Sequence, residues 1–174
     1  MKKTILLLLL VFTFGCDNND DKATSNNPID QLPPVTQVGA NKVGCLLDGK
    51  AFLPDQGPLS TNCFYQIVND KYYFYVNFNN FSNDIFKSIS LGTESLEIQQ
   101  NQEYDLMERI DGNAYGMYNE NIDVNYTSNI HKGKLLITKI TNQIVSGTFW
   151  FDVQDSNGVV HQIREGRFDM KYTN

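Results

Sequence analysis

The fold of this chain is decided by a stretch whose side chains alternate in character, Lys71-Tyr72-Tyr73-Phe74-Tyr75-Val76-Asn77-Phe78-Asn79. One set of alternate positions holds Tyr72, Phe74, Val76 and Phe78, whereas the other set holds Tyr73, Tyr75, Asn77 and Asn79. Successive side chains of a strand point to opposite sides, so this alternation predicts a β-strand with one buried face.

Turn signals and further apolar runs surround this strand. Asn69-Asp70 links it to a run over residues 63–68, and Asp48-Gly49 suits a tight turn between two shorter runs. In the last third, a strand over 134–140 is expected to pair with one over 144–153, and Asn157-Gly158 then turns the chain into a final strand. Shorter runs lie at 86–91, 104–107, 115–118 and 122–126.

Composition favours the same class of structure. The chain holds 9 Tyr and 11 Phe but a single Trp, and aromatic residues prefer strands. No stretch beyond the first 16 residues has a helical period over about 11 residues. We therefore predict a single all-β domain over residues 42–174. About eight to ten strands form an antiparallel meander in it that closes as a β-sandwich or a β-barrel.

The N-terminus predicts an exported, lipid-anchored protein. Lys2 and Lys3 precede an apolar run over 5–14, and Gly15 and Cys16 follow it. The run is too short to span a bilayer, which takes roughly 20 apolar residues. The arrangement resembles a bacterial lipoprotein signal, which implies removal of residues 1–15 and attachment of palmitate or other acyl chains at Cys16.

Residues 16–41 are rich in Asn and Pro and poor in apolar residues, which predicts a disordered tether. Asp17, Asp20 and Asp21 directly follow the lipid site and resemble the export signal of Bacteroidetes-type lipoproteins that reach the cell surface. We expect an outer-membrane protein exposed at the surface. A solvated linker on a domain that faces the periplasm is the alternative.

Two cysteines remain after Cys16. Cys45 and Cys63 form a pair in a chain expected outside the cytoplasm, which predicts a disulfide. Two buried free thiols are the alternative. A catalytic thiol would need a nearby histidine, and the sequence places neither His131 nor His161 beside a cysteine.

Charge and motif content exclude several functions. The formal net charge is −6, and it becomes −8 when Lys2 and Lys3 are removed, so a nucleic-acid partner is not expected. No catalytic triad and no metal-binding pair can be assembled from two histidines. We therefore expect no catalysis, no cofactor and no metal site.

Several blocks of the domain carry a family resemblance. These are Gly44–Gly49, Gly133–Lys139, Val145–Phe151 and Glu165–Asp169. They resemble the strands of small uncharacterised Bacteroidetes-type lipoproteins, a domain of unknown function with a Gly-Thr-Phe-x-Phe strand near its C-terminus. The resemblance implies a shared fold and no particular activity.

Three aromatic side chains are candidates for a binding patch. Tyr73, Tyr75 and Trp150 lie opposite the expected core faces of their strands, where rings can stack on a glycan or anchor an envelope protein. Burial of one of these faces under a second sheet is the alternative. We expect a binding or structural module of the envelope, held to the membrane by its lipid. A lipocalin-like carrier with an apolar cavity of at least roughly 300 Å³ is the alternative.

Overall fold

A computed structural model of the chain describes residues 26–173. Cys16, Asp17, Asp20, Asp21 and the expected signal peptide lie outside the described residues. The described elements are a 3₁₀ turn and eleven strands: η1 (Pro28–Gln31), β1 (Lys42–Leu47), β2 (Lys50–Phe52), β3 (Thr61–Val68), β4 (Lys71–Ser82), β5 (Ile85–Thr93), β6 (Gln102–Leu106), β7 (Ala114–Glu120), β8 (Asp123–Tyr126), β9 (Gly133–Ile140), β10 (Ile144–Gln154) and β11 (Val160–Lys171).

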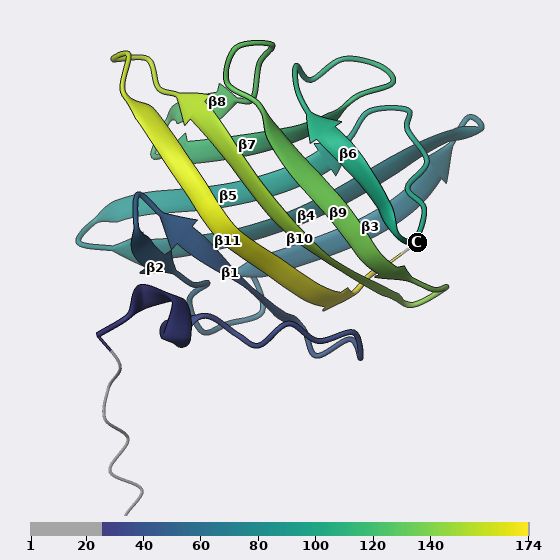
Figure 1. Ribbon diagram of the computed structural model, residues 1–174, viewed down its shortest axis with the longest axis horizontal. Helices are drawn as coiled ribbons and strands as arrows, with labels where there is room; N and C mark the ends of the chain where they lie inside the picture. Colours follow the sequence, from purple (N-terminus) through teal and green to yellow (C-terminus); the bar gives the residue numbers. More distant parts are fainter. Residues whose placement is uncertain (1–25, 174) are drawn as a thin grey trace, which may run out of the picture.

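The strands form one sheet that folds over on itself. Ten of them follow the order β2-β1-β11-β10-β9-β6-β7-β5-β4-β3, and β8 pairs with β7. In Figure 1, β9, β10 and β11 pass in front of β3, β4, β5 and β7 and cross them at a steep angle. We call the β2-to-β6 part the front layer and the β7-to-β3 part, with β8, the back layer.

The predicted all-β class is confirmed, and the sheet is open, as in a sandwich. Its two edges are β2 and β3, which do not pair with each other. The layers join where β6 runs parallel to β7 through the single pair Leu106–Ala114. A closed barrel would need a continuous ladder around the core, so the fold is sandwich-like.

The predicted hairpins are confirmed where the turn chemistry was clear. Asp48 and Gly49 have φ of 51° and 77° between β1 and β2, and Asn69 and Asp70 have φ of 51° and 61° between β3 and β4. Asp, Asn and Gly tolerate this left-handed region, which a type I′ turn requires. The predicted antiparallel meander is not simple: three neighbouring pairs join strands that are not consecutive, namely β1 with β11, β6 with β9 and β5 with β7. The parallel pair of β6 and β7 also makes the sheet mixed.

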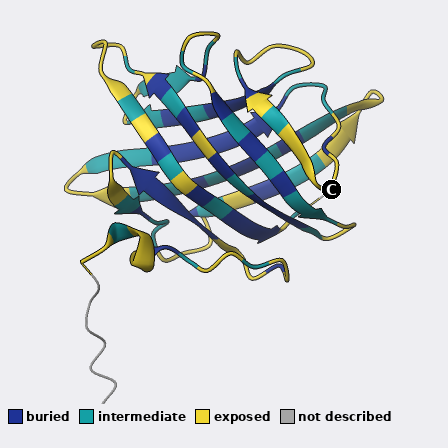
Figure 2. Cartoon of the chain, in the orientation of Figure 1, coloured by how far each residue is buried: buried dark blue, intermediate teal, exposed yellow. Residues whose placement is uncertain are grey.

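The core lies between the two layers, and six of its buried side chains are phenylalanine rings. Phe74 and Phe78 of β4 are at most 1% exposed. The Phe74 ring lies 6.0 Å from that of Phe168 on β11, and the Phe78 ring lies 6.4 Å from that of Phe149 on β10. Figure 2 shows the buried positions running along the strands of both layers. The side chains of Phe74, Val76 and Phe78 therefore face the core, as their alternation predicts.

The expected tether differs from the structure over residues 26–41. Leu32 is buried in this segment. Asp169 of β11, which is 2% exposed, holds the segment through four hydrogen bonds. Its carboxylate accepts hydrogen bonds from Thr36 Oγ1 and from the backbone N–H groups of residues 38, 39 and 40. The prediction failed because composition reports how little a segment can bury by itself, and this segment is held by a residue about 130 positions away.

The expected disulfide is not formed in the structure. Cys45 and Cys63 are both buried free thiols. Cys45 lies on β1 opposite Phe52, and Cys63 lies on β3 opposite Val76. The two strands lie in different layers and do not pair with each other. The structure agrees with the alternative of two buried free thiols.

Candidate functional site

The three predicted patch residues do not form one patch. Tyr73 and Tyr75 lie on the outer face of β4 in the back layer, and Trp150 lies on β10 in the front layer. Each strand turns its other face to the shared core, so the two outer faces point away from each other. The prediction of a single patch is wrong, and two separate surfaces take its place.

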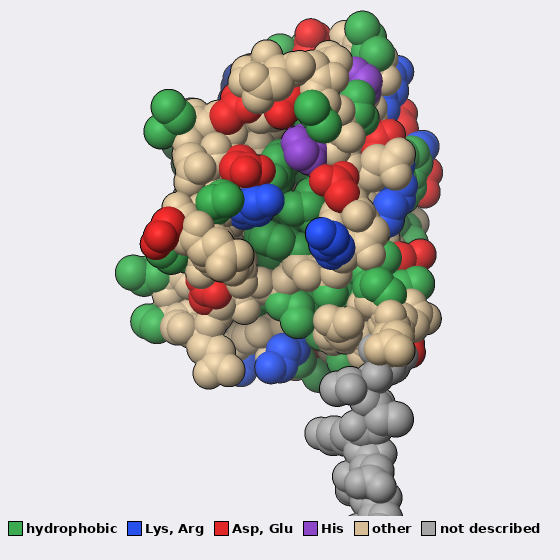
Figure 3. Space-filling model, turned by 90° about the vertical axis from the view of Figure 1, so that its left-hand side faces the viewer, with side chains coloured by type: hydrophobic (Ala, Val, Ile, Leu, Met, Phe, Trp, Pro, Cys, Tyr) green, Lys and Arg blue, Asp and Glu red, His purple; other side chains and the backbone are tan. Residues whose placement is uncertain are grey.

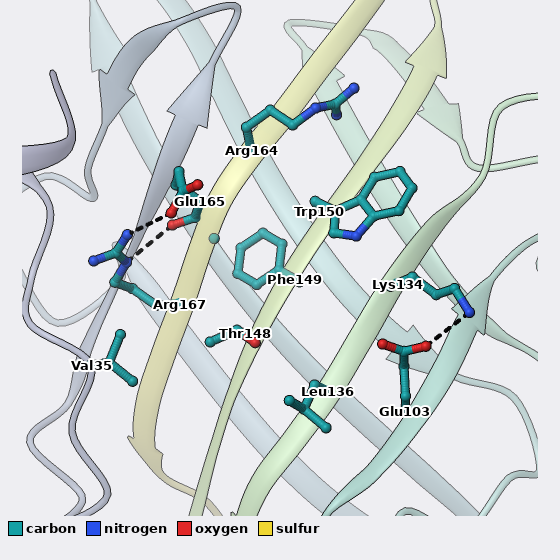
Figure 4. A pocket seen from close by; sticks show the side chains of 11 residues that line it. Val35, Glu103, Lys134, Leu136, Thr148, Phe149, Trp150, Arg164, Glu165 and Arg167 are labelled. Carbon is teal, nitrogen blue, oxygen red and sulfur yellow. Dashed lines mark hydrogen bonds and ion pairs between the residues drawn. The ribbon is translucent and has the colours of Figure 1, made fainter.

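The first surface is a front groove of about 400 Å³ (Figure 4). Trp150, which is 43% exposed, forms part of its wall, with the guanidinium of Arg164 5.4 Å from the ring centroid. Leu136 and Thr148 lie along its middle, and Val35 of the N-terminal segment lies at the opposite end from Trp150.

The charged side chains that line the front groove are paired with oppositely charged neighbours. Lys134 Nζ lies 2.9 Å from Glu103 Oε1 (Figure 4), and Arg164 Nη2 lies 2.6 Å from Asp152 Oδ1. Exposed pairs of this kind contribute about 0–1 kcal/mol each. Arg167 Nη2 also lies 3.3 Å from Glu165 Oε2, so each charged residue that lines the groove has an oppositely charged partner. Trp150 is its exposed ring, because Phe149, which also lines it, is 3% exposed.

The second surface is built around the small outward-facing residues of β5. Gly92 lies in register with Tyr75 of β4 on one side and with Tyr115 of β7 on the other. Phe64 of β3 in turn lies opposite Tyr75. Four neighbouring strands thus align three aromatic residues in one row across the back layer, and the ring of Tyr115 lies over Gly92.

Hydrogen bonds and ring contacts fix this row. The rings of Phe64 and Tyr75 stack with centroids 5.2 Å apart. The Tyr75 hydroxyl lies 3.0 Å from Ser90 Oγ, which also accepts a 2.8 Å bond from Asn77 Nδ2. Tyr73, the other predicted residue on this face, has its hydroxyl 3.4 Å from Ser95 Oγ.

Arg109 covers the far end of the row. Its guanidinium carbon lies 5.1 Å from the centroid of Tyr115 and 5.5 Å from that of Tyr126. Nε donates to Glu94 Oε1 at 2.6 Å, and Nη1 donates to the Tyr126 hydroxyl at 3.0 Å. The bond to Glu94 raises the pKa of Arg109 above its usual range. Burial raises the pKa of Tyr115 to about 12, so its hydroxyl stays protonated at neutral pH.

Two adjoining hollows lie along these residues, one of about 380 Å³ and one of about 420 Å³. Both are lined by Phe64, Tyr75, Arg109 and Tyr115. Gln66, Tyr73 and Glu94 lie only in the first, and Tyr126 lies only in the second. We call this surface the aromatic trough, defined by Phe64, Gln66, Tyr73, Tyr75, Glu94, Arg109, Tyr115 and Tyr126.

Sequence reasoning found two of the trough residues, Tyr73 and Tyr75. Phe64 could also have been predicted. It lies on the strand expected over residues 63–68, which was expected to pair with the strand that carries Tyr75, and the two residues are direct partners in the ladder. Tyr126 ends the predicted run 122–126, but nothing in the sequence placed that run beside Tyr115, and Arg109 lies outside the predicted strands. Their positions depend on the path of the chain between β6 and β9.

A polar cluster at one end of the sandwich was the remaining candidate for chemistry. His161 Nδ1 lies 2.8 Å from Asp48 Oδ2, and its ring centroid lies 4.7 Å from that of Tyr118. Figure 3 shows that side of the molecule, where acidic and basic side chains surround a small apolar hollow. The described residues hold no set of three or more His, Cys, Asp or Glu side chains placed to bind a metal ion.

The buried thiols do not take part in such a cluster. Burial raises the pKa of Cys63 to about 12 and that of Cys45 well above its usual value. A nucleophilic cysteine needs the thiolate, whereas burial keeps both of these thiols protonated. Both side chains belong to the hydrophobic core.

No protein-family model, curated protein or solved structure matches this chain significantly. Within residues 26–173, no helix has the length and apolar character to cross a membrane.

Proposed function

We propose that this chain is a lipid-anchored lipoprotein of the bacterial cell envelope whose β-domain is a binding module without catalytic activity. The aromatic trough is its binding surface. The observation that carries this proposal is the row of Phe64, Tyr75 and Tyr115 across the back layer, with Arg109 over its end. Phe64 and Tyr75 are partly exposed, and Tyr115 is buried beneath Arg109. Rings held in fixed positions bind a partner with little loss of side-chain entropy.

The position in the envelope is supported by the N-terminal sequence. Cys16 is the proposed lipid site, and Asp17, Asp20 and Asp21 form the proposed signal for display on the outer face of the outer membrane. A diacyl or triacyl anchor holds firmly because each buried methylene contributes about 0.8 kcal/mol. The likeness to small Bacteroidetes-type lipoproteins agrees with this location.

The packing of the core favours an external binding surface over a lipocalin-like carrier. The rings of Phe74, Phe78, Phe149, Phe151 and Phe168 occupy the space between the layers and contact one another. A carrier needs that space for its ligand.

Site-specific photo-crosslinking on intact cells tests the binding surface. A photoreactive residue replaces Gln66, which is exposed and lines the trough, and in a control it replaces the exposed Gln154 on β10. We expect a crosslinked product from the Gln66 position alone. Equal products from both positions, or none from Gln66, would contradict the proposal.

Two further measurements test the location. Cys16→Ala should abolish labelling by a fatty-acid analogue, and retained labelling would contradict the lipid site. Protease added to intact cells should remove a surface-displayed domain, whereas a domain that faces the periplasm would survive.

A further inference from the structure

We infer that the aromatic trough binds a neutral oligosaccharide chain of two or more sugar units. This inference rests on the proposed function, and it names the ligand of that binding surface. It follows from the chemistry of the trough, from its charge balance and from the size of its hollows.

The chemistry of the trough matches the two-sided character of a sugar. A pyranose ring has an apolar face of C–H groups, which stacks on aromatic rings, and a rim of hydroxyls, which needs neutral or charge-balanced polar groups. Phe64 and Tyr75 are partly exposed rings that stack on each other with centroids 5.2 Å apart, and both contribute apolar surface to the two hollows. The Gln66 amide and the Tyr73 hydroxyl line the same hollow and can bond sugar hydroxyls.

The charge balance favours a neutral ligand. Arg109 and Glu94 are the charged side chains that line the two hollows, and they neutralise each other through a 2.6 Å ion pair. An acidic polysaccharide would have to compete with Glu94 for Arg109 while approaching an acidic protein, of net charge −6, or −8 without Lys2 and Lys3.

The dimensions favour a short stretch of chain over a single sugar. Two hollows of about 380 Å³ and 420 Å³ adjoin at four shared residues, so a ligand can occupy both without a break. Each falls within the range of small-ligand sites, about 300–1,000 Å³. A protein partner would rely on a larger surface, about 800 Å² on each side.

The floor of the trough is already organised. The hydroxyls of Tyr75 and Tyr73 are bonded to Ser90 and Ser95, and Tyr115 is held under Arg109. A rigid floor reduces the ordering cost of binding, which suits a ligand that makes few contacts per unit.

The test uses the full lipidated chain, extracted in a detergent that has no sugar headgroup. Its mobility is measured in native gels that contain a neutral β-glucan, an α-mannan, a xylan or an acidic polygalacturonate. Oligosaccharides of increasing length from any polymer that retards the protein are then titrated by calorimetry. We expect retardation by at least one neutral polymer, none by polygalacturonate, and weaker binding of the monosaccharide than of the disaccharide.

Three variants locate the site. Tyr75→Ala removes a ring and should weaken binding about tenfold, whereas Tyr75→Phe keeps the ring, loses only the bond to Ser90, and should weaken binding less than Tyr75→Ala does. Trp150→Ala, which removes an exposed ring from the opposite face, should bind unchanged. If Tyr75→Ala does not fold, Gln66→Ala on the surface takes its place, with an expected loss of about fivefold.

The outcomes separate this inference from the proposed function. Retention of an acidic polymer, or glycan binding that is unaffected by Tyr75→Ala, overturns the neutral-glycan inference. Failure of every glycan, combined with a protein crosslinked at Gln66, also overturns it and leaves the binding module intact. Failure of both glycans and crosslinking overturns the inference and the proposed function together.

Discussion

The carboxylate of Asp169 accepts a 2.6 Å hydrogen bond from the hydroxyl of Thr36, so β11, the last strand in the sequence, holds the segment that precedes β1. The other oxygen, Oδ1, accepts from Gly39 N at 2.8 Å and from Ser146 Oγ at 2.7 Å. One buried side chain thus joins the N-terminal segment, β10 and β11. This arrangement fixes the path of residues 36–40 beside β10 and β11.

Asp169→Asn should destabilise the domain by about 2–4 kcal/mol, because an amide has one acceptor oxygen and turns its NH₂ group toward backbone donors. Urea unfolding monitored by circular dichroism measures the change. Asp70→Asn is the matched control, since Asp70 lies exposed in a turn with φ of 61°, which Asn also tolerates. A loss below about 0.5 kcal/mol in Asp169→Asn would show that water replaces these bonds.

The stability of the domain should fall in acid through the same group. Burial alone would raise the pKa of Asp169, but the hydrogen bonds from Thr36, Ser146, Val38 and Gly39 lower the pKa well below its usual range. A carboxyl with a lowered folded pKa stabilises the protein fully above its unfolded pKa of about 3.9. That contribution is lost as the pH falls further, toward the folded pKa.

The measurement is the free energy of unfolding of wild type and Asp169→Asn between pH 7 and pH 2. The difference between the two proteins should be constant above about pH 5 and should shrink below about pH 4. A difference that is independent of pH would mean that Asp169 does not carry this acid sensitivity.

Cys45 and Cys63 should be unreactive in the folded protein and should both react after unfolding without reductant. Burial raises the pKa of Cys63 to about 12, and thiolate is the reactive form. Alkylation followed by peptide mapping measures each cysteine separately, so the state of Cys16 does not affect the result. Protection of both cysteines in the denatured, unreduced protein would show that they are bonded to each other.

Gly92→Ala should destabilise the domain by about 1–3 kcal/mol and weaken ligand binding at the aromatic trough. An added Cβ would lie 2.9 Å from Cε1 of Tyr115, and that ring is 5% exposed beneath Arg109. Thermal and urea unfolding measure the loss.

The penalty of Gly92→Ala should shrink in a Tyr115→Ala background, because the ring that the Cβ meets is then absent. An equal penalty in both backgrounds would place its origin in the backbone of β5.

Local signals were strong where neighbours in sequence are also neighbours in space. The alternation at 72–79, the Asn69-Asp70 turn and the Asp48-Gly49 turn each concern residues that contact one another within a hairpin, and all three predictions are confirmed. The predicted disulfide and the predicted tether concerned contacts between distant segments, and the structure differs from both predictions. Alternation also identified Tyr75 as outward-facing, but it carried no information on which layer each outward face belongs to.

By itself, the sequence determined the all-β class, the positions of most hairpins and the division of each strand into an apolar and a polar face, because these follow from the pleat and from turn geometry. Only the tertiary structure decided that β1 pairs with β11, that Tyr75 and Trp150 lie on opposite surfaces, and that Arg109 covers Tyr115. Such contacts join residues that are far apart in the chain or on strands whose order is set by packing. They are settled by how two layers bury one common core, which no local pattern encodes.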